Sequence, residues 1–127
     1  MQKELILCCI TAQSSCIAIL EKGKEMATRM GLGIKGVSVQ PIKQDAARRA
    51  SDMKILDALS KQSGIEISII YSDNPLLALA EYAEQNLPIH IFTGKQADKS
   101  SFVMKLAESC KLPVSMVAGE TVFTVTN

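Results

Sequence analysis

Six consecutive apolar residues, Leu5–Ile10, stand directly before a stretch of polar and small residues, Thr11–Ser15. A strand without apolar–polar alternation is typical of a sheet that is covered on both faces. Behind it, small and apolar residues recur at three- and four-residue spacing as far as Gly31, which indicates an amphipathic helix. The first 31 residues therefore predict a central strand and a helix, with Ser14 or Ser15 as N-cap and Gly31 as C-terminal stop.

Strands and helices alternate along the rest of the chain, and each helical pattern carries small or apolar residues on one stripe. On the second helix this stripe comprises Ala46, Ala50, Met53 and Leu56, and on the third it ends at Leu87. Further strands are expected at 32–39, 65–71, 89–92 and 114–117, and further helices at 45–63, 74–87 and 100–110, the last capped by Ser100 or Ser101.

This alternating order determines the fold class that we predict. Strands separated by helices lie parallel, because a right-handed crossover returns the chain to the same edge of the sheet. We expect one α/β domain over residues 1–127, a doubly wound five-stranded parallel sheet with helices on both faces. An alternating tail, Thr121–Val125, could add a further strand or meet a second subunit.

Charge and composition exclude several classes of partner. Lys and Arg number 14 against 13 Asp and Glu, so the net charge of +1 provides no field to hold a polyanion. Aromatic residues make up 4% and tryptophan is missing, which removes the stacking surfaces of single-strand binders. The apolar runs are far shorter than the roughly 20 residues of a membrane span. We expect no nucleic-acid partner, no membrane insertion, no signal peptide and a cytoplasmic location with reduced cysteines.

The topology also places a ligand crevice. In a doubly wound sheet it lies beyond the carboxyl ends of the strands, where the strand order reverses. In this chain that position falls on the loops Thr11–Ser15 and Thr93–Ser101, each of which leads into a helix whose free N–H groups favour an anion. The same residue types are ordinary N-caps and turn formers, so the pattern leaves both interpretations open.

Catalytic and metal signals are weak. A Gly-x-Gly-x-x-Gly pattern at Gly31, Gly33 and Gly36 ends a helix and begins a strand, the reverse of a dinucleotide-binding loop. His90 is the one histidine and falls inside a short strand, so a nucleophile in the crevice would lack a base. We find no metal-ligand spacing. The sequence predicts no catalytic residues, no metal site and no enzymatic activity.

The chain resembles universal stress protein domains, and more closely the version embedded in potassium-responsive sensor histidine kinases. The resemblance extends from Leu5 to about Ala118 and rests on Leu7–Ile10, Ala27–Gly33, Ile34–Val39 and Lys111–Val117. It implies a Rossmann-like fold of the adenine nucleotide alpha hydrolase type and a regulatory role. It also implies a homodimer and makes a sensor histidine kinase a candidate partner.

Two departures from this family bear on ligands. Thr11 stands where ATP-binding members have an aspartate that contacts adenine. Gly94 and Ser100-Ser101 match the ends of the family's phosphate loop G-x2-G-x9-G-[ST], but the middle glycine is missing and the segment between is much shorter. The resemblance therefore implies that ATP is not bound in the family's usual manner.

A second pattern within the family, S-x-S-x20-F-T-A-x-Y, is typical of cyclic di-AMP receptors. Its spacing fits Thr11–Gln13 and Ile34–Ser38, but both serines and both aromatic residues are replaced. Cyclic di-AMP is therefore a ligand to test.

Two hypotheses follow. The leading one is a non-enzymatic regulatory domain that docks to itself through the fifth strand and the tail residues Val122, Phe123 and Val125. The alternative is a nucleotide sensor for AMP, ATP or cyclic di-AMP linked to a potassium-responsive kinase. No cofactor is assigned beyond an adenine nucleotide as candidate ligand. The residues assigned to the ligand crevice are Thr11, Ala12, Gln13, Ser14, Ser15, Val39, Gly94, Lys95, Ser100 and Ser101.

Overall fold

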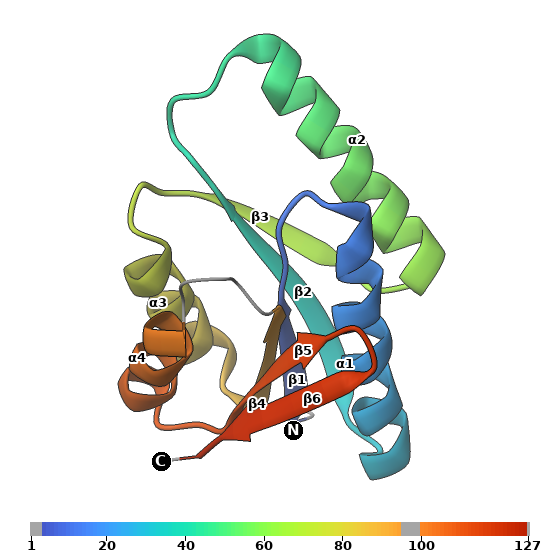
Figure 1. Cartoon of the computed structure of the whole chain (residues 1–127), viewed down its shortest axis with the longest axis vertical. Helices are drawn as coiled ribbons and strands as arrows, with labels where there is room; N and C mark the ends of the chain where they lie inside the picture. The colour runs from blue at the N-terminus through green and yellow to red at the C-terminus, as the bar shows by residue number, and fades with distance from the viewer. Residues whose placement is uncertain (1–3, 95–99, 127) are drawn as a thin grey trace.

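The computed structural model describes residues 4–94 and 100–126 and has a single sheet with helices on both faces (Figure 1). The predicted α/β class is confirmed. The strands are β1 (Leu5–Cys9), β2 (Gly33–Gln40), β3 (Ile67–Tyr71), β4 (Pro88–Gly94), β5 (Val114–Ala118) and β6 (Thr121–Val125). The helices are the short 3-10 helix η1 (Ser14–Cys16), α1 (Ile17–Met30), α2 (Ala46–Ser63), α3 (Pro75–Asn86) and α4 (Ser100–Cys110).

The strand order is β3-β2-β1-β4-β5-β6. The five predicted strands run parallel, and the tail adds β6 antiparallel to β5, with Met116 opposite Phe123. The sheet thus has six strands rather than five. Because β5 has neighbours on both edges, the expectation that a second subunit pairs with the fifth strand is corrected. The free edge on this side of the sheet belongs to β6.

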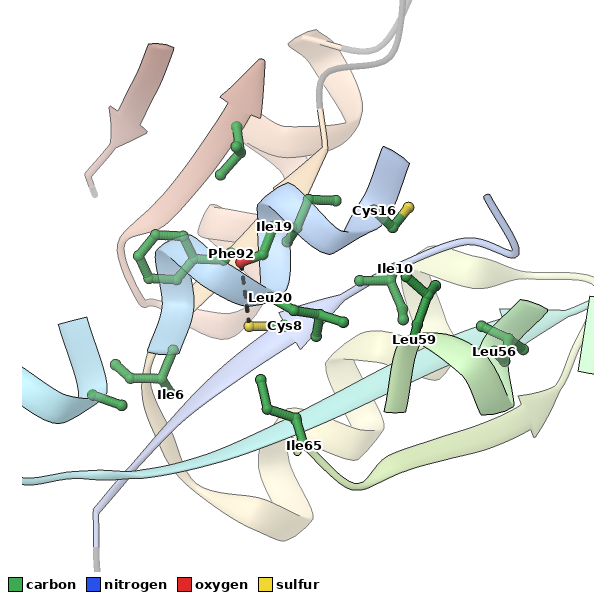
Figure 2. Close-up of a cluster of buried hydrophobic side chains, with 12 residues drawn as sticks. Ile6, Cys8, Ile10, Cys16, Ile19, Leu20, Leu56, Leu59, Ile65 and Phe92 are labelled. Atoms are coloured by element: carbon green, nitrogen blue, oxygen red, sulfur yellow. Dashed lines mark hydrogen bonds between the residues drawn. The ribbon is translucent and has the colours of Figure 1, made fainter. Parts of the chain in front are cut away.

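The first strand is buried on both faces, which explains its unbroken apolar run. Ile6, Cys8 and Ile10 pack beneath α1 and α2, as Figure 2 shows, and Leu7 and Cys9 pack beneath α3 and α4. All five are at most 7% exposed. Each face therefore has its own apolar core, and β1 lies at the centre of both.

Helix ends follow the predicted signals with one correction. Gly31 ends α1 in the left-handed conformation at φ 68°, and the Asp45 side chain caps α2 by accepting from the Arg48 N–H at 2.8 Å. Neither Ser14 nor Ser15 caps α1, because both lie within η1 and the α-helix begins only at Ile17. The chain tightens into a 3-10 turn before the α-helix, which is common at helix N-termini.

Two predicted buried stripes are wrong at their ends. Ala46, Ala50 and Met53 are exposed, and α2 is buried only from Leu56 onward. An α-helix of 18 residues is roughly 27 Å long, whereas the five-residue strand β3 is roughly 17 Å long. The amino-terminal half of α2 therefore extends past the sheet (Figure 1). Leu87, the expected end of the α3 stripe, lies beyond the helix with a left-handed φ of 51° and is 66% exposed.

Candidate functional site

The strand order reverses between β1 and β4, since the chain builds the sheet outward from β1 through β2 and then from β4 through β5. Two cavities open at the carboxyl ends of these strands, where a doubly wound sheet binds its ligands. Cys9, Thr11 and Thr93 line both cavities. The two cavities therefore meet over the end of β1, one toward each face of the sheet.

The cavity on the α1 side, here called the polar chamber, has a volume of about 390 Å³. Gln13, Ser15 and Cys16 contribute to it from the loop and turn that follow β1. The hydroxyl of Thr11 lies 3.5 Å from the Cys16 sulfur, which ties the loop to the start of the helix. Gly94 lines the opposite wall, where a Cβ would approach the Ile19 Cδ1 atom to 3.0 Å. The complete lining is Cys9, Thr11, Gln13, Ser15, Cys16, Ala18, Ile19, Thr93, Gly94, Val117, Ala118 and Gly119.

The cavity on the α3 and α4 side, here called the apolar chamber, has a volume of about 310 Å³. Aliphatic and aromatic side chains form its walls, and Thr11, Asn74 and Thr93 are its neutral polar groups. The Asn74 side-chain oxygen also caps α3 by accepting from the Leu77 N–H at 3.2 Å, which holds the asparagine at the rim. An apolar slot with a few polar groups is typical of small-molecule sites. Its other lining residues are Cys9, Ile10, Val37, Val39, Pro75, Leu76, Leu79 and Phe102.

Neither lining contains an aspartate, glutamate, lysine, arginine or histidine among the described residues. Burial, with smaller contributions from Cys8 and Cys110, raises the pKa of the Cys9 thiol, which therefore stays protonated at neutral pH. No group of three metal-ligating side chains occurs in the described part of the chain. Hydrogen-bonding and apolar contacts are what these two chambers can offer a ligand.

His90 lies within the sheet, as predicted from its place in a short strand. Its Nε2 atom is 2.7 Å from the Ser115 Oγ atom, and its ring lies 4.9 Å from the Phe92 ring. Burial lowers the pKa of the His90 imidazole, which favours the neutral form. His90 lines neither chamber.

The structure brings half of the predicted crevice residues to the chambers. Thr11, Gln13, Ser15, Val39 and Gly94 line them. Ala12 and Ser14 belong to the same loop without lining either chamber, and Ala12 instead packs against the core. Lys95 and the side chains of Ser100 and Ser101 lie outside the described residues, although α4 begins at Ser100.

Sequence reasoning found Thr11 and Val39 of the apolar chamber but missed the residues that the helices contribute to it. Leu76, Leu79 and Phe102 lie on helical stripes, which identify core residues but not the space left between them. Thr93 belonged to a predicted loop but lies at the end of β4 and is 5% exposed. Its place after a short apolar strand was the one available signal.

The residues expected at a subunit interface lie on the outermost strand. Val122 and Phe123 are 39% and 50% exposed, while Val125 packs partly against the core beneath α4. Phe123 pairs with Met116 and Val122 with Val117, so the two exposed side chains lie on opposite faces of the sheet.

None of the described helices is both long and apolar enough to cross a bilayer. No protein-family model matches the sequence, and no curated protein matches it. Solved structures do resemble it. A universal stress protein from Archaeoglobus fulgidus superposes with a TM-score of 0.72 at 15% identity, covering 91% of this chain and 93% of that one.

Two further similar structures contain nucleotides. A universal stress protein in complex with cAMP has a TM-score of 0.70 at 13% identity, with 92% of this chain and 98% of that one covered. The Archaeoglobus fulgidus universal stress protein in complex with dAMP has a TM-score of 0.65 at 12% identity, with 92% and 98% covered. The chain therefore has the fold of universal stress proteins, as the sequence resemblance implied. None of these structures is a sensor kinase.

Proposed function

We propose that this chain is a non-enzymatic regulatory domain that binds a nucleoside or a nucleoside monophosphate across the two chambers. The observation that carries the proposal is that an apolar and a polar chamber meet at Cys9, Thr11 and Thr93, over the carboxyl ends of β1 and β4. This is the position at which doubly wound sheets bind ligands.

The apolar chamber suits a purine base. Val39, Leu76 and Leu79 offer flat aliphatic contact, and threonine hydroxyls can both donate and accept hydrogen bonds to the edge of a base. Thr11 stands where ATP-binding members of the family have an aspartate, and its hydroxyl would form uncharged hydrogen bonds with the edge of the base. Adenine is favoured because similar structures are complexes with cAMP and dAMP.

The polar chamber suits a sugar and a single phosphate. Gln13, Ser15 and Thr93 supply neutral hydrogen-bonding groups, and the described lining holds no cation to balance a triphosphate. The short step from Gly94 to Ser100 supports the same conclusion, since little chain is available to wrap additional phosphates. We therefore expect ATP to bind no more tightly than AMP.

A regulatory role is favoured over catalysis by the chemistry of the linings. A hydrolase or transferase needs a base or an activated nucleophile near the ligand. The Cys9 thiol, kept protonated by burial, supplies neither. The cytoplasm is the proposed compartment, because all four cysteines, Cys8, Cys9, Cys16 and Cys110, are free thiols.

A homodimer through β6 is part of the proposal. Among the described strands none pairs with the outer edge of β6, and such an edge is a template for a second strand. The exposed side chain of Phe123, which lies on the face of β6 away from α1, would gain cover from a second copy. A potassium-responsive sensor kinase as further partner is supported by the sequence resemblance alone, and addition of the chain to such a kinase in a phosphorylation assay tests it.

Thermal unfolding with adenosine, AMP, dAMP, cAMP, ATP and cyclic di-AMP tests the ligand. A ligand at a hundred times its Kd stabilises the folded state by about 2.7 kcal/mol. We expect adenosine or a monophosphate to stabilise, and Val39→Phe, which fills the apolar chamber, to remove the effect. Met104→Phe is the matched control, since Met104 is exposed on α4 and lies outside both chambers. The absence of any shift with all six compounds would refute the proposal, and a much larger shift with ATP would refute the phosphate argument.

A further inference from the structure

One region of the sheet lies open because of the topology. α1 and α2 pack on one face and α3 and α4 on the other, as the two core clusters show. α1 lies against β1, β2 and β4, with only slight contact to β5, so no described helix covers β6 on the α1 face. A groove of about 260 Å³ lies there, between α1 and the β5–β6 hairpin. It shares no lining residue with the two chambers.

A chain of hydrogen bonds forms the polar floor of this groove. It runs from the His90 Nε2 atom to the Ser115 Oγ atom at 2.7 Å, and from there to the Thr124 Oγ1 atom at 2.8 Å. The three residues lie on β4, β5 and β6, so the chain crosses three neighbouring strands. Ser115 is 1% exposed whereas Thr124 is exposed, and both line the groove. The outer end of the chain is therefore accessible to a ligand.

The α1 wall of the groove carries two cations and one carboxylate. Lys22, Met26 and Arg29 recur at helical spacing and line the groove together with Glu25. The Lys22 Nζ atom lies 3.7 Å from a Glu25 oxygen and 3.5 Å from a Glu120 oxygen, and the Glu120 side chain is 97% exposed. Both ion pairs are long and both carboxylates lie on exposed side chains, so the pairs contribute little and Lys22 can turn to another anion at small cost.

The rest of the wall is apolar, with Met26, Phe92 and Val122. Two cations beside exposed hydroxyl and apolar surface are complementary to a carboxylate on a small apolar body. A neutral isostere would gain the apolar contacts without the charge-assisted ones.

We propose that the groove between α1 and β6 is a second binding site, which takes a small aromatic or branched aliphatic carboxylate. The carboxylate lies between the Thr124 hydroxyl and the Lys22 and Arg29 side chains, and the apolar body packs on Met26, Phe92 and Val122. This site is separate from the crevice at β1 and β4 and goes beyond the function proposed above.

The floor couples this site to the charge of His90. When the imidazole is protonated, Nε2 can only donate, so Ser115 accepts from it and donates to Thr124, whose own proton then points outward. A bound carboxylate accepts that proton and stabilises the protonated chain. The charged groups that surround this row of hydrogen bonds are Lys22, Glu25 and Arg29 on α1 and Glu120 in the β5–β6 turn. Because coupling is reciprocal, carboxylate binding raises the pKa of His90, which burial lowers in the free protein.

NMR titration of the full chain with benzoate tests the site, with benzamide as the neutral isostere. We expect backbone shifts to map to α1 and β6, and benzoate to bind at least tenfold more tightly than benzamide. The pKa of His90, followed by its ring proton, rises in saturating benzoate, and benzoate affinity falls as the pH passes above that pKa.

Thr124→Val keeps the side-chain shape and removes the hydroxyl, and Lys22→Gln removes a cation without altering the sheet. Each is expected to weaken benzoate binding about fivefold or more, whereas Thr121→Val on the same strand, outside the groove, leaves it unchanged. The inference is overturned if benzamide binds as tightly as benzoate, if the shifts map to the crevice, or if the pKa of His90 does not move. Unchanged benzoate binding in both groove variants also overturns it. Nucleotide binding in the crevice is measured separately, so failure of one site leaves the other to be judged on its own.

Discussion

Gly23 provides a test of how closely α1 approaches the central strand. The residue is buried in the middle of α1, and a Cβ atom built on it would overlap the Cys8 Sγ atom of β1. Cys8 is fully buried, and its thiol points at the Ile19 carbonyl oxygen at 3.9 Å (Figure 2). The sulfur therefore has little room to withdraw. In an open helix Gly→Ala would instead stabilise by about 1 kcal/mol.

The magnitudes give a double-mutant cycle with a clear sign. Overpacking a core costs about 1–3 kcal/mol, so Gly23→Ala should lower the free energy of unfolding by up to about 2 kcal/mol after its helix-propensity gain of about 1 kcal/mol. Cys8→Ala should cost about 1–2 kcal/mol by leaving a cavity. In the double variant the new methyl group occupies the space that the sulfur vacates. We expect the double variant to be no less stable than Cys8→Ala alone, a favourable coupling of about 1–2 kcal/mol.

Urea unfolding measures each free energy by linear extrapolation. Cys9→Ala is the matched control, because Cys9 neighbours Cys8 but packs in the core on the opposite face. Its effect should add to that of Gly23→Ala within about 0.5 kcal/mol. If Gly23→Ala stabilises the protein, or if the Cys8 cycle is additive, the close helix–strand contact described here is wrong.

Two further perturbations address the sheet edge and the buried histidine. Phe123→Asp should yield monomers in sedimentation velocity at concentrations where the wild type is dimeric, with Leu77→Asp, at an equally exposed apolar residue on α3, as control. A Phe123→Asp variant that remains dimeric would exclude this face of β6 as the interface. Burial lowers the pKa of His90 in the folded state below its ordinary value of 6.5, so the unfolded chain binds the proton more readily. The stability that neutral His90 contributes is therefore complete above about pH 6.5 and is lost as pH falls through the folded pKa. His90→Gln should flatten that part of the stability profile, and an unchanged acid limb in urea unfolding would show that His90 is not its source.

Local patterns were sufficient for the elements and the fold class. The unbroken apolar run of β1 indicated a strand with two buried faces. Gly31 and Gly64 adopt the left-handed conformation directly after the predicted ends of α1 and α2. Asn74 with Pro75 began α3 as predicted. These features depend on residues a few positions apart, and the strand–helix order then allows few topologies.

The candidate site was located from sequence, but its shape was not. The topology placed it at the loops after β1 and β4, and Thr11, Gln13, Ser15 and Gly94 line the chambers. A stripe of apolar residues shows which face of a helix is buried. It does not show where two packed helices leave space, so apart from Val39 the apolar walls emerged only from the structure.

The remaining features depend on elements far apart in the chain. The overhang of α2 follows from the length of a helix relative to the strand it covers, and the pairing of β6 with β5 decides which edge of the sheet is free. The contact between His90 and Ser115 joins residues 25 positions apart through the register of two parallel strands. Sequence periodicity shows which residues avoid water, because the pattern depends only on each residue and its near neighbours in the chain. Cavities and hydrogen bonds between strands depend on the relative placement of whole elements, which only tertiary packing determines.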